Sequence, residues 1–179
     1  MIFELDKVNS IANHFLAELR DAEIQKDSLR FRKNLERLGE VMAYEVSKNL
    51  TFKSADVKTS LGIKSTQLLI EQPVLITILR AGLPFFNGFL NFFDKANSGF
   101  IGAYRVENEQ KNISVASDYI ATGDLNEKDL IIVDPMLATG KSLVSTIEQL
   151  LKNGRPKSIH IVAAIAAPEG ISYIKQNLN

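Results

Sequence analysis

The stretch from Leu130 to Ser142 constrains the fold of this chain more than any other part of the sequence. Leu130–Val133 is an apolar and mostly β-branched run, which is typical of a strand buried on both faces. Asp134 follows it, and Pro135, which has no backbone N–H, predicts that the paired strand ends there. The small and polar residues that come next lead into an apolar stripe at helical spacing, formed by Leu143, Val144, Ile147, Leu150 and Leu151.

A loop of small residues that opens a helix is a good anion site. The segment Ala138–Ser142 leaves backbone N–H groups without helical partners, and the helix dipole adds roughly half a positive charge there. Phosphate is the usual ligand of such a site. The sequence therefore predicts a phosphate-binding loop between this strand and its helix.

Two phosphate-binding motifs compete for the loop. Gly140-Lys141-Ser142 fits the end of the P-loop of nucleotide hydrolases, but Pro135 stands where that motif needs its first glycine. In the phosphoribosyltransferase loop, an acidic residue at the strand end holds ribose hydroxyls and a Thr/Gly/Ser turn holds a 5′-phosphate. Asp134 is in the right place for the first of these tasks. An ordinary strand-to-helix turn explains Gly140 but not the acidic and hydroxyl residues together.

Several segments, in chain order, resemble motifs of the uracil phosphoribosyltransferase family. Asp134–Gly140 resembles its diphosphoribosyl-binding motif, and Ile78–Leu83 resembles its diphosphate loop. Ile101–Arg105 resembles its second arginine segment and Ala166–Gly170 its later strand-to-helix turn. Further likenesses, at Leu19–Asp21, Phe31–Arg32 and Met42–Glu45, extend the match over nearly the whole chain. Each motif alone is weak, whereas the ordered set is specific.

The resemblance implies an enzyme that transfers the phosphoribosyl group of 5-phosphoribosyl-1-diphosphate (PRPP) to uracil, giving UMP and diphosphate. It also implies Mg²⁺ bound mainly through PRPP rather than by the protein directly, a homodimer, and a cytoplasmic location. Some members of the family are activated by GTP, and no feature of this sequence decides whether this one is. A non-catalytic PRPP-binding regulator and a phosphoribosyltransferase for another base remain alternatives.

The resemblance also assigns candidate site residues. Arg80, Arg105 and Asp134 are the catalytic candidates, because guanidinium groups can bridge the phosphate oxygens on which charge develops and a carboxylate can accept hydrogen bonds from ribose. Lys141 stands where the family more often has glycine, so it either adds a charge to the phosphate site or points into solvent. The expected PRPP-binding set comprises Arg80, Arg105, Asp134, Pro135, Met136, Leu137, Ala138, Thr139, Gly140, Lys141 and Ser142.

The fold class predicted is α/β, with one domain over residues 1–179. Strands and helices alternate from Val74 onward, which predicts a mostly parallel sheet with ligands bound beyond the C-terminal ends of its strands. N-terminal helices are expected over residues 1–50. The remaining residues, 51–179, form the core, with a β-hairpin arm at about 104–120 and a polar loop over Val106–Lys111.

Helix and strand ends are predicted from local signals. Asn9 or Ser10 is expected to cap the first helix and Asp27 or Ser28 the second. Gly62 is expected to end a strand through Val57 and Thr59, with a short strand over residues 67–70. Asn153–Gly154 is expected to end the helix that begins near Ser142. Pro84 should open a helix whose phenylalanines pack in the core or against another subunit rather than around an aromatic ligand.

Composition excludes several classes of function. Lys plus Arg and Asp plus Glu both number 21, so a broad nucleic-acid or membrane-binding surface is not expected. The chain has no cysteine, which excludes disulfides and thiolate metal sites and fits a cytosolic protein. No signal-peptide pattern or membrane-spanning apolar run is present.

The resemblance is incomplete at one point. The family continues past the Ala166–Gly170 motif with a further strand and a Gly-rich segment that contacts uracil, and no such segment precedes Asn179. We therefore expect the chain to be part of a longer protein, with the uracil-binding residues beyond Asn179.

Overall fold

The structure, a computed structural model, describes residues 2–107 and 113–178, without the side chains of residues 103–118. Two short 3-10 helices, η1 and η2, accompany the α-helices and strands. In chain order the elements are η1 (Leu5–Lys7), α1 (Ala12–Arg20), η2 (Ile24–Lys26), α2 (Ser28–Ser47), β1 (Phe52–Thr59), β2 (Gly62–Leu69), β3 (Val74–Leu79), α3 (Leu83–Phe92), β4 (Asn97–Glu107), β5 (Ile113–Ala121), β6 (Asp129–Leu137), α4 (Lys141–Leu150), β7 (Ser158–Ala166) and α5 (Pro168–Asn177).

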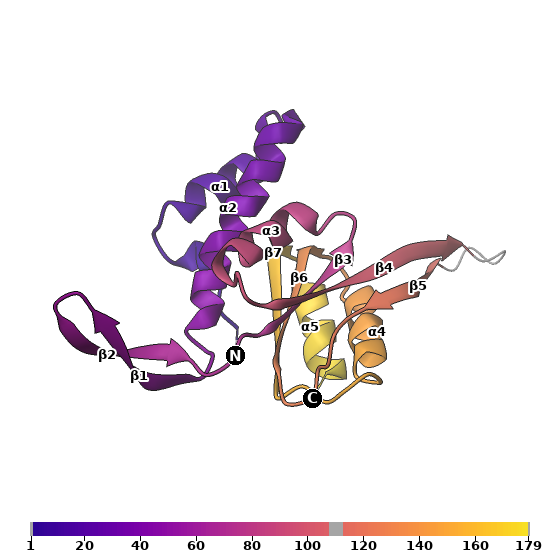
Figure 1. Cartoon of the computed structure of the whole chain (residues 1–179). Coiled ribbons are helices and arrows are strands. Elements are labelled where there is room, and N and C mark those ends of the chain that lie inside the picture. Colours follow the sequence, from indigo (N-terminus) through magenta and orange to yellow (C-terminus); the bar gives the residue numbers. More distant parts are fainter. Residues whose placement is uncertain (1, 108–112, 179) are drawn as a thin grey trace.

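A five-stranded sheet in the order β5-β4-β3-β6-β7 forms the centre of the molecule. Neighbours among β4, β3, β6 and β7 run parallel, and only the β4–β5 pair is antiparallel. The β4–β5 hairpin extends away from the body (Figure 1). The predicted α/β fold with a mostly parallel sheet and a hairpin arm is therefore confirmed.

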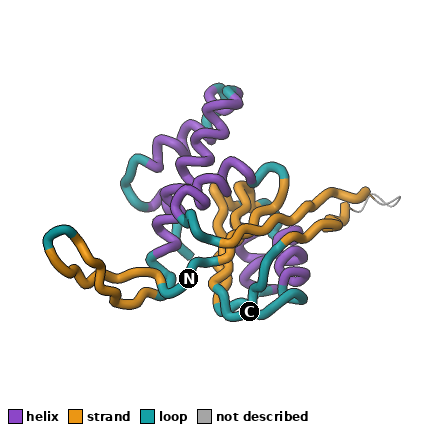
Figure 2. Tube along the Cα trace, in the orientation of Figure 1, coloured by secondary structure: helices purple, strands orange, loops and turns teal. Residues whose placement is uncertain are grey.

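Helices cover both faces of the sheet (Figures 1 and 2). On one face, α1, α2 and α3 share a core with Leu75, Ile131 and Val133. On the other face, α4 and α5 pack on a second core that includes Val74, Ile76 and further strand residues. Neighbouring residues of one strand thus point to opposite cores, which explains why these strands are apolar without alternation.

The aromatic helix predicted after Pro84 is α3, and three of its four phenylalanines are core residues. Phe85, Phe86 and Phe89 are fully buried, and the Phe85 and Phe89 rings meet edge to face with centroids 5.6 Å apart. Phe92 alone among the α3 phenylalanines is half exposed. The interpretation of these rings as packing rather than a ligand box is therefore confirmed.

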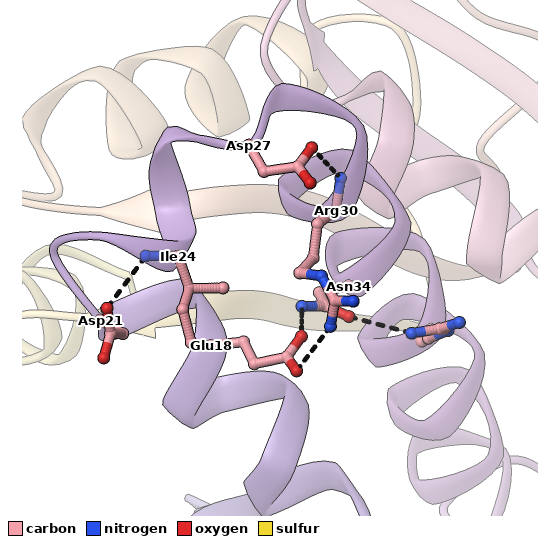
Figure 3. Close-up of polar contacts among 7 residues, drawn as sticks. Glu18, Asp21, Ile24, Asp27, Arg30 and Asn34 are labelled. Atoms are coloured by element: carbon pink, nitrogen blue, oxygen red, sulfur yellow. Dashed lines mark hydrogen bonds and ion pairs between the residues drawn. The ribbon is translucent and has the colours of Figure 1, made fainter.

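Polar contacts join the two N-terminal helices (Figure 3). Glu18 of α1 accepts hydrogen bonds from Arg30 Nη1 at 2.8 Å and Asn34 Nδ2 at 2.6 Å, both in α2. These hydrogen bonds hold the pKa of Glu18 below its usual range. Asp27 caps α2 by accepting from the backbone N–H groups of residues 29 and 30, as predicted.

The predicted cap of α1 is wrong. Neither Asn9 nor Ser10 stands at that position, because α1 begins at Ala12 and its N-cap residue is Ile11, which has no side-chain capping group. The turn before the helix is closed instead by a backbone bond from Asn13 N to Ser10 O, at 3.1 Å.

The prediction for the segment after α2 is also wrong in detail. Gly62 does not end a strand but begins β2, which runs to Leu69 and pairs antiparallel with β1. The positive φ of Gly62, 143°, lets the chain reverse at this point. The β1–β2 hairpin is a separate two-stranded sheet (Figure 1), and Leu61 and Ile63 at its tip are 98% and 75% exposed.

Three predicted boundaries in the second half of the chain change. β6 does not end at Pro135 but continues to Leu137, paired with β7. Pairing of β6 with β3 already ends at Val133, so the N–H that Pro135 lacks breaks no hydrogen bond to β3. α4 ends at Leu150 rather than near Gly154, since the bond from Asn153 N to Leu150 O tightens the chain into a turn. Of the loop predicted at 106–111, residues 106 and 107 belong to β4 and the rest lies outside the described residues.

Candidate active site

The loop after β3 places Arg80 beyond the sheet. Arg80 follows Leu79, the last residue of β3, through a cis peptide bond, and its side chain is exposed. Gly82 N–H donates to Ile78 O at 3.3 Å, and Leu83 N–H donates to Arg80 O at 3.3 Å, so the chain turns directly into α3. Arg80 therefore lies in a tight turn between a buried strand and a buried helix.

Asp134 lies on the adjacent strand, β6, in a half-buried position. Burial raises the pKa of its carboxyl group, and a hydrogen bond from the backbone N–H of Met136 opposes this effect. A carboxylate that burial has partly desolvated favours a ligand that donates hydrogen bonds to it, as ribose hydroxyls do.

The turn between β6 and α4 contains the other predicted phosphate-binding residues. Ala138, Thr139, Lys141 and Ser142 are exposed there. Gly140 is the N-cap residue of α4, with a left-handed φ of 76° and no side chain to cap the helix. The first N–H groups of α4 thus have no side-chain cap, which leaves them free to bind an anion.

The start of α5 fixes this turn from behind. Ala167 N–H donates to Leu137 O at 2.8 Å. A Cβ on Gly170 would overlap the carbonyl oxygen of Ala138, and a Cβ on Gly140 would lie 2.8 Å from Gly170 O. Sequence reasoning noted Ala166–Gly170 only as a resemblance and did not place Gly170 at the site. The signal available was a glycine in the first turn of a helix, which indicates close approach of another backbone.

The remaining predicted residues fall into three groups. Pro135 and Leu137 are buried in β6, so they can offer a ligand only backbone atoms. Met136 points outward and is 56% exposed. Arg105 lies in β4, paired with Val115, and its side chain is outside the described residues.

The sheet brings the two main loops to the same edge. β3 and β6 are neighbouring parallel strands whose last paired residues are Thr77 and Val133. Asp134 therefore follows the shared end by one residue and Arg80 by three. On the other side of β3, Leu79 is level with Gly102 of β4, so the Arg105 backbone lies beyond that end too. This is the edge at which open α/β sheets bind ligands.

Comparison with known proteins identifies the family of the chain. The sequence model of the family described as Uracil phosphoribosyltransferase matches residues 8–179. The uracil phosphoribosyltransferase of Porphyromonas gingivalis is 47% identical over 174 residues, which cover 97% of this chain and 81% of that protein. The chain belongs to the uracil phosphoribosyltransferase family.

More distant relatives agree with this assignment. The uracil phosphoribosyltransferase of Pyrococcus furiosus is 37% identical over 90% of this chain and 69% of its own length. The solved structure of the AQ2163 protein from Aquifex aeolicus has a TM-score of 0.84 and 34% identity, covering 99% of this chain and 82% of that one. A purine phosphoribosyltransferase from Pyrococcus horikoshii, at 21% identity and a TM-score of 0.55, shares the fold.

The side chains that the structure describes form no metal cage. Within residues 2–102 and 119–178, no group of three or more histidine, aspartate or glutamate side chains could hold a metal ion. Mg²⁺ in phosphate-transfer sites is commonly held by one or two carboxylates together with substrate oxygens. Asp134, a half-buried carboxylate at the loop, fits that arrangement.

A groove runs along β7 between the N-terminal segment, α2 and α5, with a volume of about 980 Å³. Leu137 of the predicted PRPP-binding set lines it, whereas Arg80, Asp134 and Gly140 do not. The candidate active site is therefore located by the chemistry of its loops and not by the size of the groove.

In the described part of the chain, no helix is long and apolar enough to cross a membrane.

Proposed function

We propose that this protein is a uracil phosphoribosyltransferase that forms UMP and diphosphate from uracil and PRPP. The observation that carries the proposal is the meeting of the Arg80 turn and the Asp134–Ser142 turn at one edge of the sheet, in a chain of this family. The Arg80 turn offers contacts for the diphosphate of PRPP, and the Asp134–Ser142 turn offers contacts for its ribose 5-phosphate.

The main chemical difficulty is the departure of diphosphate. As the bond from ribose C1′ to the leaving oxygen breaks, negative charge grows on diphosphate and the ribose becomes cationic. Arg80 is exposed at the strand end, where its guanidinium can bind two diphosphate oxygens at once and stabilise that charge. Arg105, beyond the same edge in β4, is proposed for the same task.

The second turn is proposed to hold the ribose 5-phosphate half. The Asp134 carboxylate accepts hydrogen bonds from the ribose hydroxyls, which replace the water that burial removes. The first N–H groups of α4, with the hydroxyls of Thr139 and Ser142, bind the 5′-phosphate. Lys141 is exposed at the first position of α4, where its ammonium group adds positive charge to the same site. Pro135 and Leu137 contribute only backbone atoms, because their side chains are buried.

Mg²⁺ is proposed as the cofactor, held mainly by PRPP oxygens and water, with Asp134 as the nearest protein carboxylate. When bound, Mg²⁺ neutralises part of the diphosphate charge. The chain's own residues bind and orient PRPP around it.

Two further proposals concern uracil and the assembly. Contacts to uracil are proposed to come from residues beyond Asn179 in a longer form of the protein. A homodimer is proposed because Leu61 and Ile63 are exposed on an isolated two-stranded sheet, which is rarely stable without a partner surface. A second copy of the chain, which carries the same apolar tip, is the partner. GTP binding and a cytoplasmic location stay predictions from the resemblance.

The proposal is tested by measuring diphosphate release from PRPP in the presence of Mg²⁺. Uracil, cytosine and hypoxanthine are compared as acceptors, with and without GTP. Release that depends on uracil supports the proposal, and release with a different base identifies another phosphoribosyltransferase. Binding of PRPP without turnover by any form of the protein indicates a regulator, and hydrolysis of ATP without a base would favour the P-loop interpretation.

A further inference from the structure

Thr77 is a polar residue in the middle of the apolar strand β3, and the structure shows what its hydroxyl group does. The side chain is fully buried. Its Oγ1 donates a hydrogen bond of 2.8 Å to the carbonyl oxygen of Val133, on the neighbouring strand β6. Val133 is the residue immediately before Asp134. The hydroxyl therefore ties β3 to the backbone just before the Asp134–Ser142 turn, which is proposed to hold ribose 5-phosphate and is called the ribose-phosphate turn below.

The same hydroxyl also touches the turn that carries Arg80, residues 79–83, which is proposed to bind diphosphate and is called the diphosphate turn below. A Cβ added to Gly82 would overlap Thr77 Oγ1 and would lie 2.8 Å from Ile78 O, so the Gly82 backbone rests directly against the Thr77 side chain. Gly82 belongs to the short turn that carries Arg80. Its N–H donates a hydrogen bond to Ile78 O, and the carbonyl oxygen of Arg80 accepts one from Leu83 N–H. The buried hydroxyl group of Thr77 thus contacts Val133, just before one turn, and Gly82, within the other.

The position of this contact in the sheet makes it important. Thr77 and Val133 are the last paired residues of β3 and β6, and beyond them the ladder between the two strands ends. Past this point backbone pairing no longer fixes the distance between the two turns. A buried hydrogen bond with defined geometry is a way to fix it.

We propose that Thr77 is a positioning residue that sets the spacing between the diphosphate turn and the ribose-phosphate turn. This inference rests on the proposed function, because both turns must bind parts of one PRPP molecule. A ligand that spans two subsites gains affinity only if their spacing matches its own length. Thr77 touches no substrate and acts only through Val133 and Gly82.

The test compares three ligands in calorimetric titrations with Mg²⁺: PRPP, which needs both turns, and diphosphate and ribose 5-phosphate, which each need one. Thr77→Val keeps the shape and removes the hydrogen bond. We expect it to raise the Kd for PRPP by about tenfold while the Kd values of the two fragments change by less than about threefold. Thr77→Ser, which keeps the hydroxyl, should restore the wild-type Kd for PRPP.

Ile76→Val is the matched control, since Ile76 is the neighbouring residue of β3 and is equally buried. It should lower the unfolding temperature without changing the ratio of the three Kd values. If Thr77→Val does not fold, Thr77→Cys, a weaker donor, replaces it, with the same pattern expected.

The outcomes separate the two proposals. Equal weakening of all three ligands by Thr77→Val, unchanged PRPP binding, or failure of Thr77→Ser to restore it would overturn the positioning role and leave the proposed function intact. Absence of PRPP binding by the wild-type protein would overturn both.

Discussion

Replacing Gly140 by alanine tests whether the phosphate turn has the geometry described. Gly140 adopts a φ of 76°, which costs an alanine about 1–2 kcal/mol. The added Cβ would also lie 2.8 Å from Gly170 O, and forcing such a contact apart in a packed region costs about 1–3 kcal/mol. The two effects together predict a loss of about 2–5 kcal/mol.

Thermal unfolding measures this loss directly. For a domain of this size, each kcal/mol corresponds to about 2–4 °C, so Gly140→Ala should unfold about 4–20 °C below the wild type. Because Gly140 is the N-cap of α4, a shifted turn should also raise the Kd for PRPP by about tenfold or more.

Two other glycines provide matched controls. Gly123 has no positive φ and open space around its Cβ position, so Gly123→Ala should unfold within about 1 °C of the wild type. Gly62 has a positive φ, and an added Cβ would meet nothing within 4 Å. Gly62→Ala should therefore lose free energy of unfolding only through the strained backbone conformation, without a contribution from steric overlap. A Gly140→Ala protein as stable as the Gly123→Ala protein would refute the described turn and its packing on Gly170.

Four further predictions follow from single contacts. Asp134→Asn should weaken PRPP binding yet raise the unfolding temperature near neutral pH. Burial raises the pKa of this carboxyl group above 3.8, so the folded protein loses stability as pH rises through the folded-state pKa and the carboxyl group ionises. The stability gained with asparagine should therefore vanish in acid. For Glu18, whose pKa is lowered from 4.5, the stabilisation is present above that value and lost as pH falls through the folded-state pKa, so wild type and Glu18→Gln should differ in unfolding temperature at neutral pH and converge in acid. Arg80→Ala should raise the Kd for diphosphate by about 10–100-fold while ribose 5-phosphate binds as before, and equal effects on both ligands would remove Arg80 from the diphosphate site. Ile63→Asp should convert a dimer to monomer mass in light scattering, whereas a wild-type protein already of monomer mass would exclude the proposed homodimer.

Much of the fold follows from local patterns in the sequence. The apolar runs at Val74–Leu79 and Leu130–Val133 predicted buried parallel strands, because only strands covered on both faces are apolar without alternation. Asp27 predicted the start of α2, since the cap depends on residues within one turn. Such signals act over a few residues and can be read without knowing the fold.

What could not be predicted depends on partners distant in sequence. Pro135 predicted the end of a strand, but β6 continues through it. The missing N–H is tolerated because the pairing of β6 with β3 has already ended at Val133, which no local pattern indicates. Thr77 is a single hydroxyl in an apolar run, and its partner, Val133, lies 56 residues away. The spatial order β5-β4-β3-β6-β7 likewise joins strands that are not consecutive in the chain.

The most direct test of the central claim is the conversion of labelled uracil to UMP with PRPP and Mg²⁺. It is made with this chain, with any longer natural form of the protein, and with the Asp134→Asn variant of whichever form is active. The account predicts UMP from the form that includes the uracil-binding residues, at a rate that Asp134→Asn lowers. No UMP from any form, or an Asp134→Asn enzyme as active as the wild type, would contradict it.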